Sequence, residues 1–174
     1  MPSQALPYTI KSCTTSTPTG IPQNILTETK AAYWTTGSGK NHQLILELKE
    51  TALVSTIEIQ NKGVTKIAIF NSLTNAKHSY IPVLRQSIPM NRKSSLNLSS
   101  LPTRFIKILC EEGNPCSIYH ITVMGYPTDT VPKTFANLVC PQENETPLYY
   151  STTHGVRDER KDATKNGIYP RAQQ

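Results

Sequence analysis

Residues 44–70 read LILELKETALVSTIEIQNKGVTKIAIF and decide the fold class. Leu44, Leu46 and Leu48 recur at every second position, which is the period of a strand that buries one face. Residues 54–60 and 64–70 show the same alternation, and an Asn-Lys-Gly turn at 61–63 separates them. We therefore predict three strands here, with the last two paired as a hairpin through that turn.

The alternation continues toward the C-terminus. RFIKILCE at 104–111 places Ile106, Ile108 and Cys110 on one face, and SIYHITVMGY at 117–126 supplies a closing strand after a Gly-Asn-Pro turn. No stretch of residues 8–126 has the 3.6-residue period of an amphipathic helix. Short strands separated by turns predict an all-β, antiparallel sandwich with one core, for which 174 residues are sufficient.

Two regions interrupt this pattern. Residues 71–103 are rich in Ser, Asn, Pro and Lys, and we expect a long irregular connection there, with one further strand around Leu96 and Leu98. From residue 127 onward, five prolines interrupt every potential element and few aliphatic residues remain. We therefore assign residues 8–126 to the sandwich and residues 127–174 to an extended tail, either disordered or ordered along a partner.

The net charge of +6 belongs entirely to the first part of the chain. Residues 1–126 hold 12 Lys and Arg against 6 Asp and Glu, whereas residues 127–174 hold 6 of each. No acidic residue occurs between Glu58 and Glu111, but eight cations do: Lys62, Lys66, Lys77, Arg85, Arg92, Lys93, Arg104 and Lys107. Two interpretations stay open, a surface charged for solubility or a face that binds a polyanion such as nucleic acid or an acidic protein lattice.

The sequence contains no recognisable constellation for catalysis or for a cofactor. AAYWTTGSGKN at 31–41 fails as a phosphate-binding loop, because Trp34 stands where the first glycine belongs and Asn41 where the hydroxyl residue belongs. The spacing of Cys110, Cys116 and His120 lies outside that of structural zinc pairs. The four histidines occur in unrelated contexts, and we expect a protein that is not an enzyme and holds neither cofactor nor metal.

Two features predict the cellular compartment. No apolar run approaches the roughly 18 residues of a membrane span, and MPSQALPYTIKS at the N-terminus lacks the charged start and apolar stretch of a signal peptide. We expect an intracellular protein whose thiols, at Cys13, Cys110, Cys116 and Cys140, are free.

Three motifs occur in a characteristic order: PQNIL at 22–26, seven residues before Tyr33-Trp34; an apolar strand after that loop; and an Ile-x-Ile strand leading to Asn61-x-Gly63. This order resembles the discoidin or galactose-binding-like (F5/8 type C-like) family over about residues 8–126. The resemblance implies an eight-stranded jelly-roll sandwich in which Asn24 lies in a turn under the sheets and Trp34 plugs one end. A structural role suits so large an apolar side chain.

Two intracellular branches of this family are similar to the chain. IEIQNKGVTKIAIFNS and FIKILC resemble the N-terminal domain of the X-ray repair cross-complementing scaffold, which implies binding of a repair polymerase and nicked DNA. NILTETKAAYWTT resembles the small galactose-binding-like subunit of intraflagellar transport, which implies a ciliary assembly. The motifs do not separate the two branches, and the neutral tail without a basic nuclear-import cluster favours the second.

We therefore expect a non-catalytic interaction module of a ciliary or flagellar microtubule-associated assembly, with tubulin among its partners. A nuclear DNA-repair scaffold domain and a carbohydrate-binding module are the alternatives, and no membrane or small-molecule ligand is expected. The absence of aspartate before residue 129 argues against the calcium-assisted binding of some members. The eight cations named above are the candidates for an anionic partner, and the tail anchors, chosen because Tyr and Arg dominate interface hot spots, are Tyr149, Tyr150, Arg157, Tyr169 and Arg171.

Overall fold

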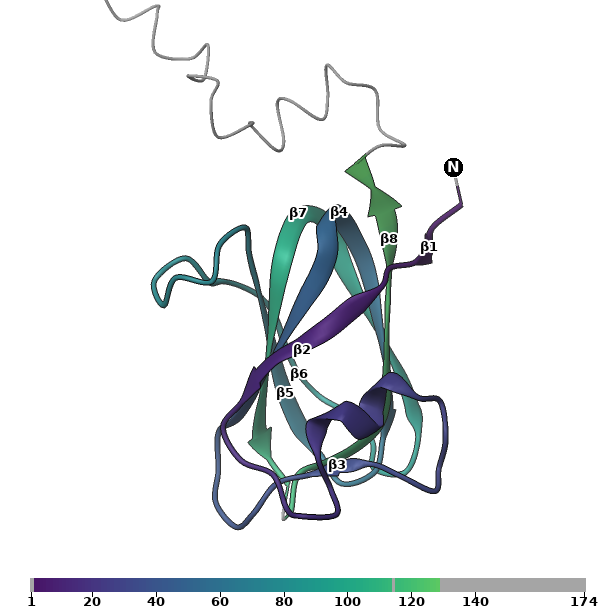
Figure 1. The fold of residues 1–174 in the computed structure, drawn as a ribbon, viewed down its shortest axis with the longest axis vertical. Coiled ribbons are helices and arrows are strands. Elements are labelled where there is room, and N and C mark those ends of the chain that lie inside the picture. Colours follow the sequence, from purple (N-terminus) through teal and green to yellow (C-terminus); the bar gives the residue numbers. More distant parts are fainter. Residues whose placement is uncertain (1, 114, 129–174) are drawn as a thin grey trace, which may run out of the picture. The chain divides into compact units, whose positions relative to one another are not determined.

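The computed structural model describes residues 2–113 and 115–128 (Figure 1). In chain order, the elements are strands β1 (Gln4–Ala5) and β2 (Tyr8–Cys13), the 3-10 turn η1 (Pro22–Leu26), and strands β3 (Trp34–Thr35), β4 (His42–Asn61), β5 (Lys66–Ser72), β6 (Ile81–Ser87), β7 (Lys93–Glu112) and β8 (Ser117–Pro127). Within these residues no helix has the length and hydrophobicity of a membrane span.

The two longest strands, β4 and β7, pair antiparallel along most of their length and build both layers of a sandwich (Figure 1). Their register breaks between Glu47 and Ala52, and the pairing partners change there. Before the break, β4 pairs with β2 and with the end of β7, which continues to β5 and β6; we call this the β6 layer. After the break, β4 pairs with the start of β7 and with β8, which carries β1 and β3; we call this the β8 layer.

The core lies between the inward faces of these two layers. Leu44, Leu46, Ile106 and Ile108 contribute from the β6 layer, and Ile57, Ile59, Ile121 and Val123 contribute from the β8 layer; all are at most 1% exposed. Each fully buried aliphatic side chain of this size contributes roughly 1.5 to 3 kcal/mol relative to exposure. The predicted antiparallel sandwich with a single core is therefore confirmed.

The predicted hairpin between residues 54–60 and 64–70 is wrong. Strand β4 pairs with β2, β7 and β8, and β5 pairs with β6 and β7. Both edges of residues 54–60 are already occupied, by β7 and β8, so that β5 cannot pair there. The turn instead crosses from the β8 layer to the β6 layer, and Asn61 holds it: its Nδ2 donates to the Val64 carbonyl at 2.6 Å, and its Oδ1 accepts from the Val64 N–H at 2.9 Å.

The expected irregular connection at 71–103 is also wrong in part. This stretch holds all of β6 and the first half of β7, where Leu96 is buried as the alternation predicts. Prolines concealed the strands, since Pro82 lies in β6, which pairs with β5 alone, and an edge strand tolerates a missing N–H.

Strand pairing begins at Gln4, and β8 ends at Pro127. The predicted tail lies outside the described residues from Asp129 onward, together with all five of its proposed anchors.

Candidate functional site

The Trp34 and Asn24 side chains lie inside the loop end of the sandwich. Trp34 is 0% exposed, and its Nε1 donates a 3.1 Å hydrogen bond to the Thr15 carbonyl. Asn24 Nδ2 donates to the carbonyls of Thr19 at 3.1 Å and Tyr33 at 3.0 Å. These contacts join the η1 turn to the loop before β3, and the buried indole has no free face for a ligand.

Four of the eight candidate cations pair with glutamates that lie outside the acid-free stretch or at its ends. Arg85 Nη2 lies 2.8 Å from Glu111, Lys93 Nζ 2.8 Å from Glu58, Arg104 Nη2 3.2 Å from Glu47, and Lys66 Nζ 3.6 Å from Glu112. The hydrogen bond from Arg85 to Glu111 raises the pKa of the Arg85 guanidinium, and the bond to Glu58 raises that of the Lys93 ammonium. Tertiary pairing therefore neutralises much of the charge that the sequence concentrates.

Two further candidates lie over aromatic rings. Lys62 Nζ is 3.1 Å from the Tyr33 ring centroid and 5.7 Å from that of Tyr119, and these two rings meet edge to face at 5.8 Å. Lys107 Nζ lies 4.3 Å from the Phe70 centroid and 4.6 Å from that of Tyr80. An ammonium over an aromatic face is held by the negative ring quadrupole.

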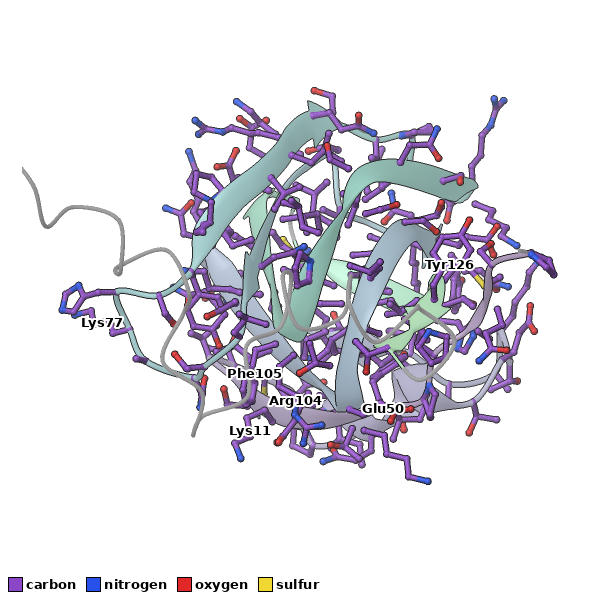
Figure 2. All side chains as sticks on the ribbon, turned by 90° about the horizontal axis from the view of Figure 1, so that it is seen from above. Lys11, Glu50, Lys77, Arg104, Phe105 and Tyr126 are labelled. Carbon is purple, nitrogen blue, oxygen red and sulfur yellow. The ribbon has the colours of Figure 1, made fainter. Side chains whose placement is uncertain are left out.

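Lys77 and Arg92 have no ion pair with any described residue. Figure 2 shows Lys77 on a loop that projects from the sandwich, far from Lys11 and Arg104. Arg92 is an exposed residue of the turn between β6 and β7. The eight cations thus lie on both layers and on separate loops.

The outer face of the β6 layer carries several apolar side chains among its polar ones. Strand alternation turns it away from the core, because Leu44, Ile69, Ile106 and Ile108 point inward. Pairing aligns its side chains in rows, Ile45 with Lys107, Phe70 with Lys107 and Pro82, and Ala68 with Leu109. We call this surface the docking face, and it comprises Ile45, Ala68, Phe70, Pro82, Phe105 and Leu109.

A groove of about 420 Å³ runs along the β5–β6 side of the docking face. Its walls include Phe70, Pro82, Val83 and Leu84, and the ion-paired Arg85 and Glu111 also line it. Strand β6 borders the groove, and among the described strands it pairs with β5 alone. The backbone groups along its second edge are therefore available to hydrogen-bond a partner.

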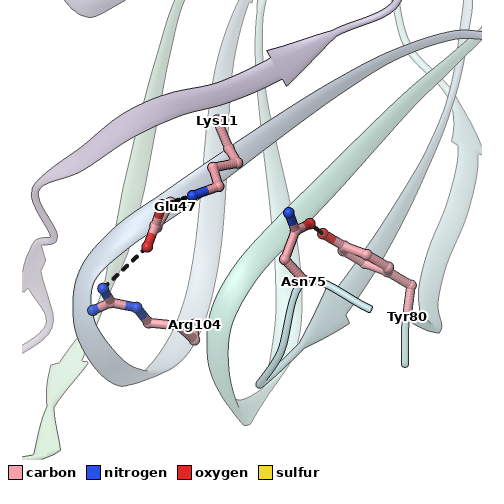
Figure 3. Close-up of polar contacts among 5 residues, drawn as sticks. All are labelled: Lys11, Glu47, Asn75, Tyr80 and Arg104. Atoms are coloured by element: carbon pink, nitrogen blue, oxygen red, sulfur yellow. Dashed lines mark hydrogen bonds and ion pairs between the residues drawn. The ribbon is translucent and has the colours of Figure 1, made fainter. Parts of the chain in front are cut away.

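Polar contacts border the docking face (Figure 3). Glu47 on β4 accepts from Lys11 on β2 at 3.1 Å and from Arg104 on β7 at 3.2 Å. The hydrogen bond from Lys11, followed by that from Arg104, lowers the pKa of the Glu47 carboxyl. Tyr80 Oη donates to Asn75 Oδ1 at 2.7 Å, which fixes the ring that packs on Lys107. Lys107 itself lies among the apolar residues of the face, between Ile45 and Phe70. Apolar residues bordered by polar contacts are typical of a protein interface.

Several described residues of types that serve catalysis or metal binding make structural contacts. Cys110 and Cys116 are buried, and their mutual hydrogen bond together with burial raises the pKa of the Cys110 thiol. His120 Nδ1 lies 2.6 Å from the Ile25 carbonyl, and Tyr8 Oη donates to the Ile121 carbonyl at 2.6 Å. In the described part of the chain, no three His, Cys, Asp or Glu side chains gather as a metal site.

The docking face was missed by sequence reasoning, although a signal for it exists. In RFIKILCE both strand faces carry apolar residues, Phe105 and Leu109 on one and Ile106 and Ile108 on the other. A strand with one solvated face would alternate more strictly. The contact of Tyr33 with Tyr119 has no comparable signal, because the residues are distant in the sequence.

Comparisons with solved structures agree with the fold. A family 32 CBM from C. perfringens NanJ, in complex with galactose, is 22% identical with a TM-score of 0.62, covering 70% of this chain and 98% of that chain. Reduced XRCC1 bound to the DNA pol beta catalytic domain is 15% identical with a TM-score of 0.63, covering 71% and 100%. The C-terminal domain of a Bacteroides fragilis chitobiase is 14% identical with a TM-score of 0.60, covering 68% and 93%. The expected galactose-binding-like jelly roll is therefore confirmed.

At the level of sequence, the search of curated proteins gives no match to this chain. The profile of the XRCC1 N terminal domain family, however, matches residues 1–107. That segment carries η1, the buried Trp34, β4 to β6 and most of β7, including the Ile45, Phe70 and Phe105 positions of the docking face. This chain belongs to the XRCC1 N-terminal domain family.

Proposed function

We propose that this chain is a non-catalytic docking domain that binds a folded partner protein through the docking face. The observation that carries this proposal is the set of half-buried apolar residues Ile45, Phe70 and Leu109 on the outer face of the β6 layer. Phe70 also lines the groove beside the β6 edge strand. A sheet face without a partner has polar outward residues. Apolar side chains at a groove, rimmed by ion pairs, fit a protein surface.

The partner that family membership favours is a DNA repair polymerase. XRCC1 in the similar solved complex is bound to the DNA pol beta catalytic domain. This supports the repair scaffold over the ciliary assembly, which no observation on the described residues favours. We retain two proposals that rest on the sequence: a ciliary setting with tubulin as partner, and an intracellular location in general. Carbohydrate binding gains no specific support, because the galactose complex is similar in fold alone.

Binding of residues 1–174 to the DNA polymerase β catalytic domain, measured by isothermal titration calorimetry, tests the proposal. We expect Phe70→Ser and Pro82→Glu each to weaken binding about tenfold or more, because they remove or charge the centre of an apolar contact. Leu26→Ser is the matched control, since Leu26 is an exposed leucine of η1, outside the docking face. Its affinity should stay within about twofold of the native chain.

Two outcomes would contradict the proposal. One is a polymerase complex whose affinity is unchanged by Phe70→Ser and Pro82→Glu while both variants melt like the native chain. The other is the absence of any complex with the polymerase domain together with unchanged co-sedimentation with microtubules in both variants, which would assign the partner contact to another surface.

A further inference from the structure

A second pocket lies on the β8 layer, outside the docking face. It forms where β4 ends and β7 and β8 begin, and it encloses about 360 Å³. Its lining residues include Lys30, Gln60, Asn61, Arg92, Lys93 and Tyr119. Gln60 and Lys93 are paired neighbours on β4 and β7, and Gln60 also pairs with His120 on β8.

Four cations lie at or beside this pocket. Lys30, Arg92 and Lys93 line it, and Lys62 reaches the ring of Tyr119 from the neighbouring turn. Two carboxylates lie beside it: Glu58 pairs with Lys93 at 2.8 Å, and Glu28 accepts from Gln60 Nε2 at 2.7 Å. Four cations against two carboxylates leave two positive charges, and neither Lys30 nor Arg92 has an ion pair with a described residue.

The Lys62 ammonium and the backbone beneath the pocket are held in place before any ligand arrives. The edge-to-face pair of Tyr33 and Tyr119 holds the Lys62 ammonium in a defined position. Asn61 fixes the backbone beneath it, since its N–H donates to the Arg92 carbonyl at 3.0 Å and its Nδ2 to the Pro89 carbonyl at 2.7 Å. Cations held in place lose less side-chain freedom when they bind an anion.

We propose that this pocket binds a phosphate monoester on a phosphorylated serine, threonine or tyrosine of a partner protein. A phosphomonoester carries a charge of roughly −1.5 to −2 at pH 7, which matches the two uncompensated positive charges. Its oxygens accept hydrogen bonds from guanidinium and ammonium groups, and Arg92 and Lys30 are the free donors. The Tyr119 ring, which lines the pocket, packs against the aliphatic or aromatic part of the modified side chain.

The two carboxylates favour one phosphorylated residue over a nucleic acid strand. Glu28 and Glu58 lie beside the cations, so a continuous row of phosphates would bring negative charge against them. A single dianion satisfies the cations without that repulsion. The inference is independent of the proposed function, because the docking face lies on the other layer.

Titration of the ¹⁵N-labelled chain, followed by NMR, tests this proposal. The probes are the capped peptides Gly-Gly-X-Gly-Gly with X as phosphoserine or phosphotyrosine, the same peptides without phosphate, inorganic phosphate, and a single-stranded oligonucleotide. We expect saturable shifts at the amides of Gln60, Asn91 and Tyr119 with a Kd of about 1 to 10 mM for the phosphopeptides, which is typical of one short charged contact.

Charge reversal locates the binding. Arg92→Glu should weaken phosphopeptide binding about tenfold or more, because it removes a free donor and adds a repelling charge. Lys77→Glu is the matched control, since Lys77 is another cation without an ion pair among the described residues but lies on a separate loop. It should change the Kd by less than about twofold.

Three outcomes would overturn the proposal. The first is an equal response to phosphorylated and unphosphorylated peptides. The second is equal loss of binding in Arg92→Glu and Lys77→Glu, which indicates nonspecific charge attraction. The third is an oligonucleotide that shifts the same amides at lower concentration than either phosphopeptide, which would assign the pocket to nucleic acid.

Discussion

Glu111 and Arg85 form a two-point ion pair, with Oε1 of Glu111 2.8 Å from Nη2 of Arg85 and Oε2 accepting from Nε at 2.9 Å. The two side chains differ in exposure, 10% for Glu111 and 66% for Arg85. The carboxylate is therefore the partner that depends on the pair, because water solvates the guanidinium in its absence.

This difference in exposure predicts which of two substitutions costs more stability. Arg85→Met leaves a carboxylate with little exposure and no cation, whereas Glu111→Gln leaves an exposed guanidinium. We expect Arg85→Met to lower the urea midpoint of unfolding more than Glu111→Gln does. A larger loss for Glu111→Gln would show that the carboxylate has another essential contact.

Trp34→Ala should cost roughly 3 to 5 kcal/mol of unfolding free energy, the usual loss for deleting a large buried aromatic side chain. Trp34 is fully buried, and its indole N–H donates to the Thr15 carbonyl. The variant therefore loses stability both from the cavity and from the Thr15 carbonyl left without its donor. Chemical denaturation measures the difference, with Trp34→Phe as a milder control. A variant of native stability that had lost only partner binding would overturn the structural role.

Gly113→Ala should destabilise the turn between β7 and β8 by about 1 to 3 kcal/mol. Gly113 has φ +147°, and a Cβ there would lie 2.5 Å from the Gly63 carbonyl oxygen. Gly37→Ala is the matched control, because nothing lies within 4 Å of its added Cβ, and its effect should stay within about 0.5 kcal/mol. Thermal melts of both variants, run side by side, check the contrast; equal melting temperatures would show that the turn relaxes freely.

The Glu47 contacts predict a pH dependence. Lys11, and then Arg104, lower the pKa of the Glu47 carboxyl in the folded state. Its contribution to stability is therefore complete above the unfolded value of about 4.3 and is lost as the pH falls through the lowered folded value. We expect Glu47→Gln to be less stable than the native chain at pH 7. The difference in stability between the two should shrink as the pH falls below about 4. Urea midpoints measured across this range check the sign, and a difference that grew toward low pH would contradict it.

The thiols should differ in reactivity in the folded protein. Cys13 is half-buried, whereas Cys110 and Cys116 are buried, and all three are free thiols. Burial raises the pKa of Cys13, so we expect slow alkylation there. Contact with Cys110 lowers the pKa of Cys116, but both thiols are buried, and we expect still slower alkylation of these two until unfolding because the reagent cannot reach them. Peptide mapping by mass spectrometry after timed iodoacetamide treatment measures this order. A Cys110–Cys116 disulfide in protein purified without reductant would contradict it; Cys140 lies outside the described residues.

Much of the fold followed from local pattern. The alternation of Leu44, Leu46 and Leu48, and of Ile106 and Ile108, predicted both the strands and their buried faces, because strand period and burial are read within a few residues. The burial of Trp34 followed from the size of its side chain and from the family resemblance.

Strand partners and charge partners were decided by the tertiary structure alone. The turn at Asn61 looks like a hairpin in the sequence, yet β4 already has β7 and β8 on its edges, and only the folded sheet reveals that competition. Likewise, the acid-free stretch looks like one basic face until Glu47 and Glu111 reach across strands to Arg104 and Arg85. Pairing between distant segments depends on the closure of long loops and on every competing contact, whereas the period of a strand depends on its own residues.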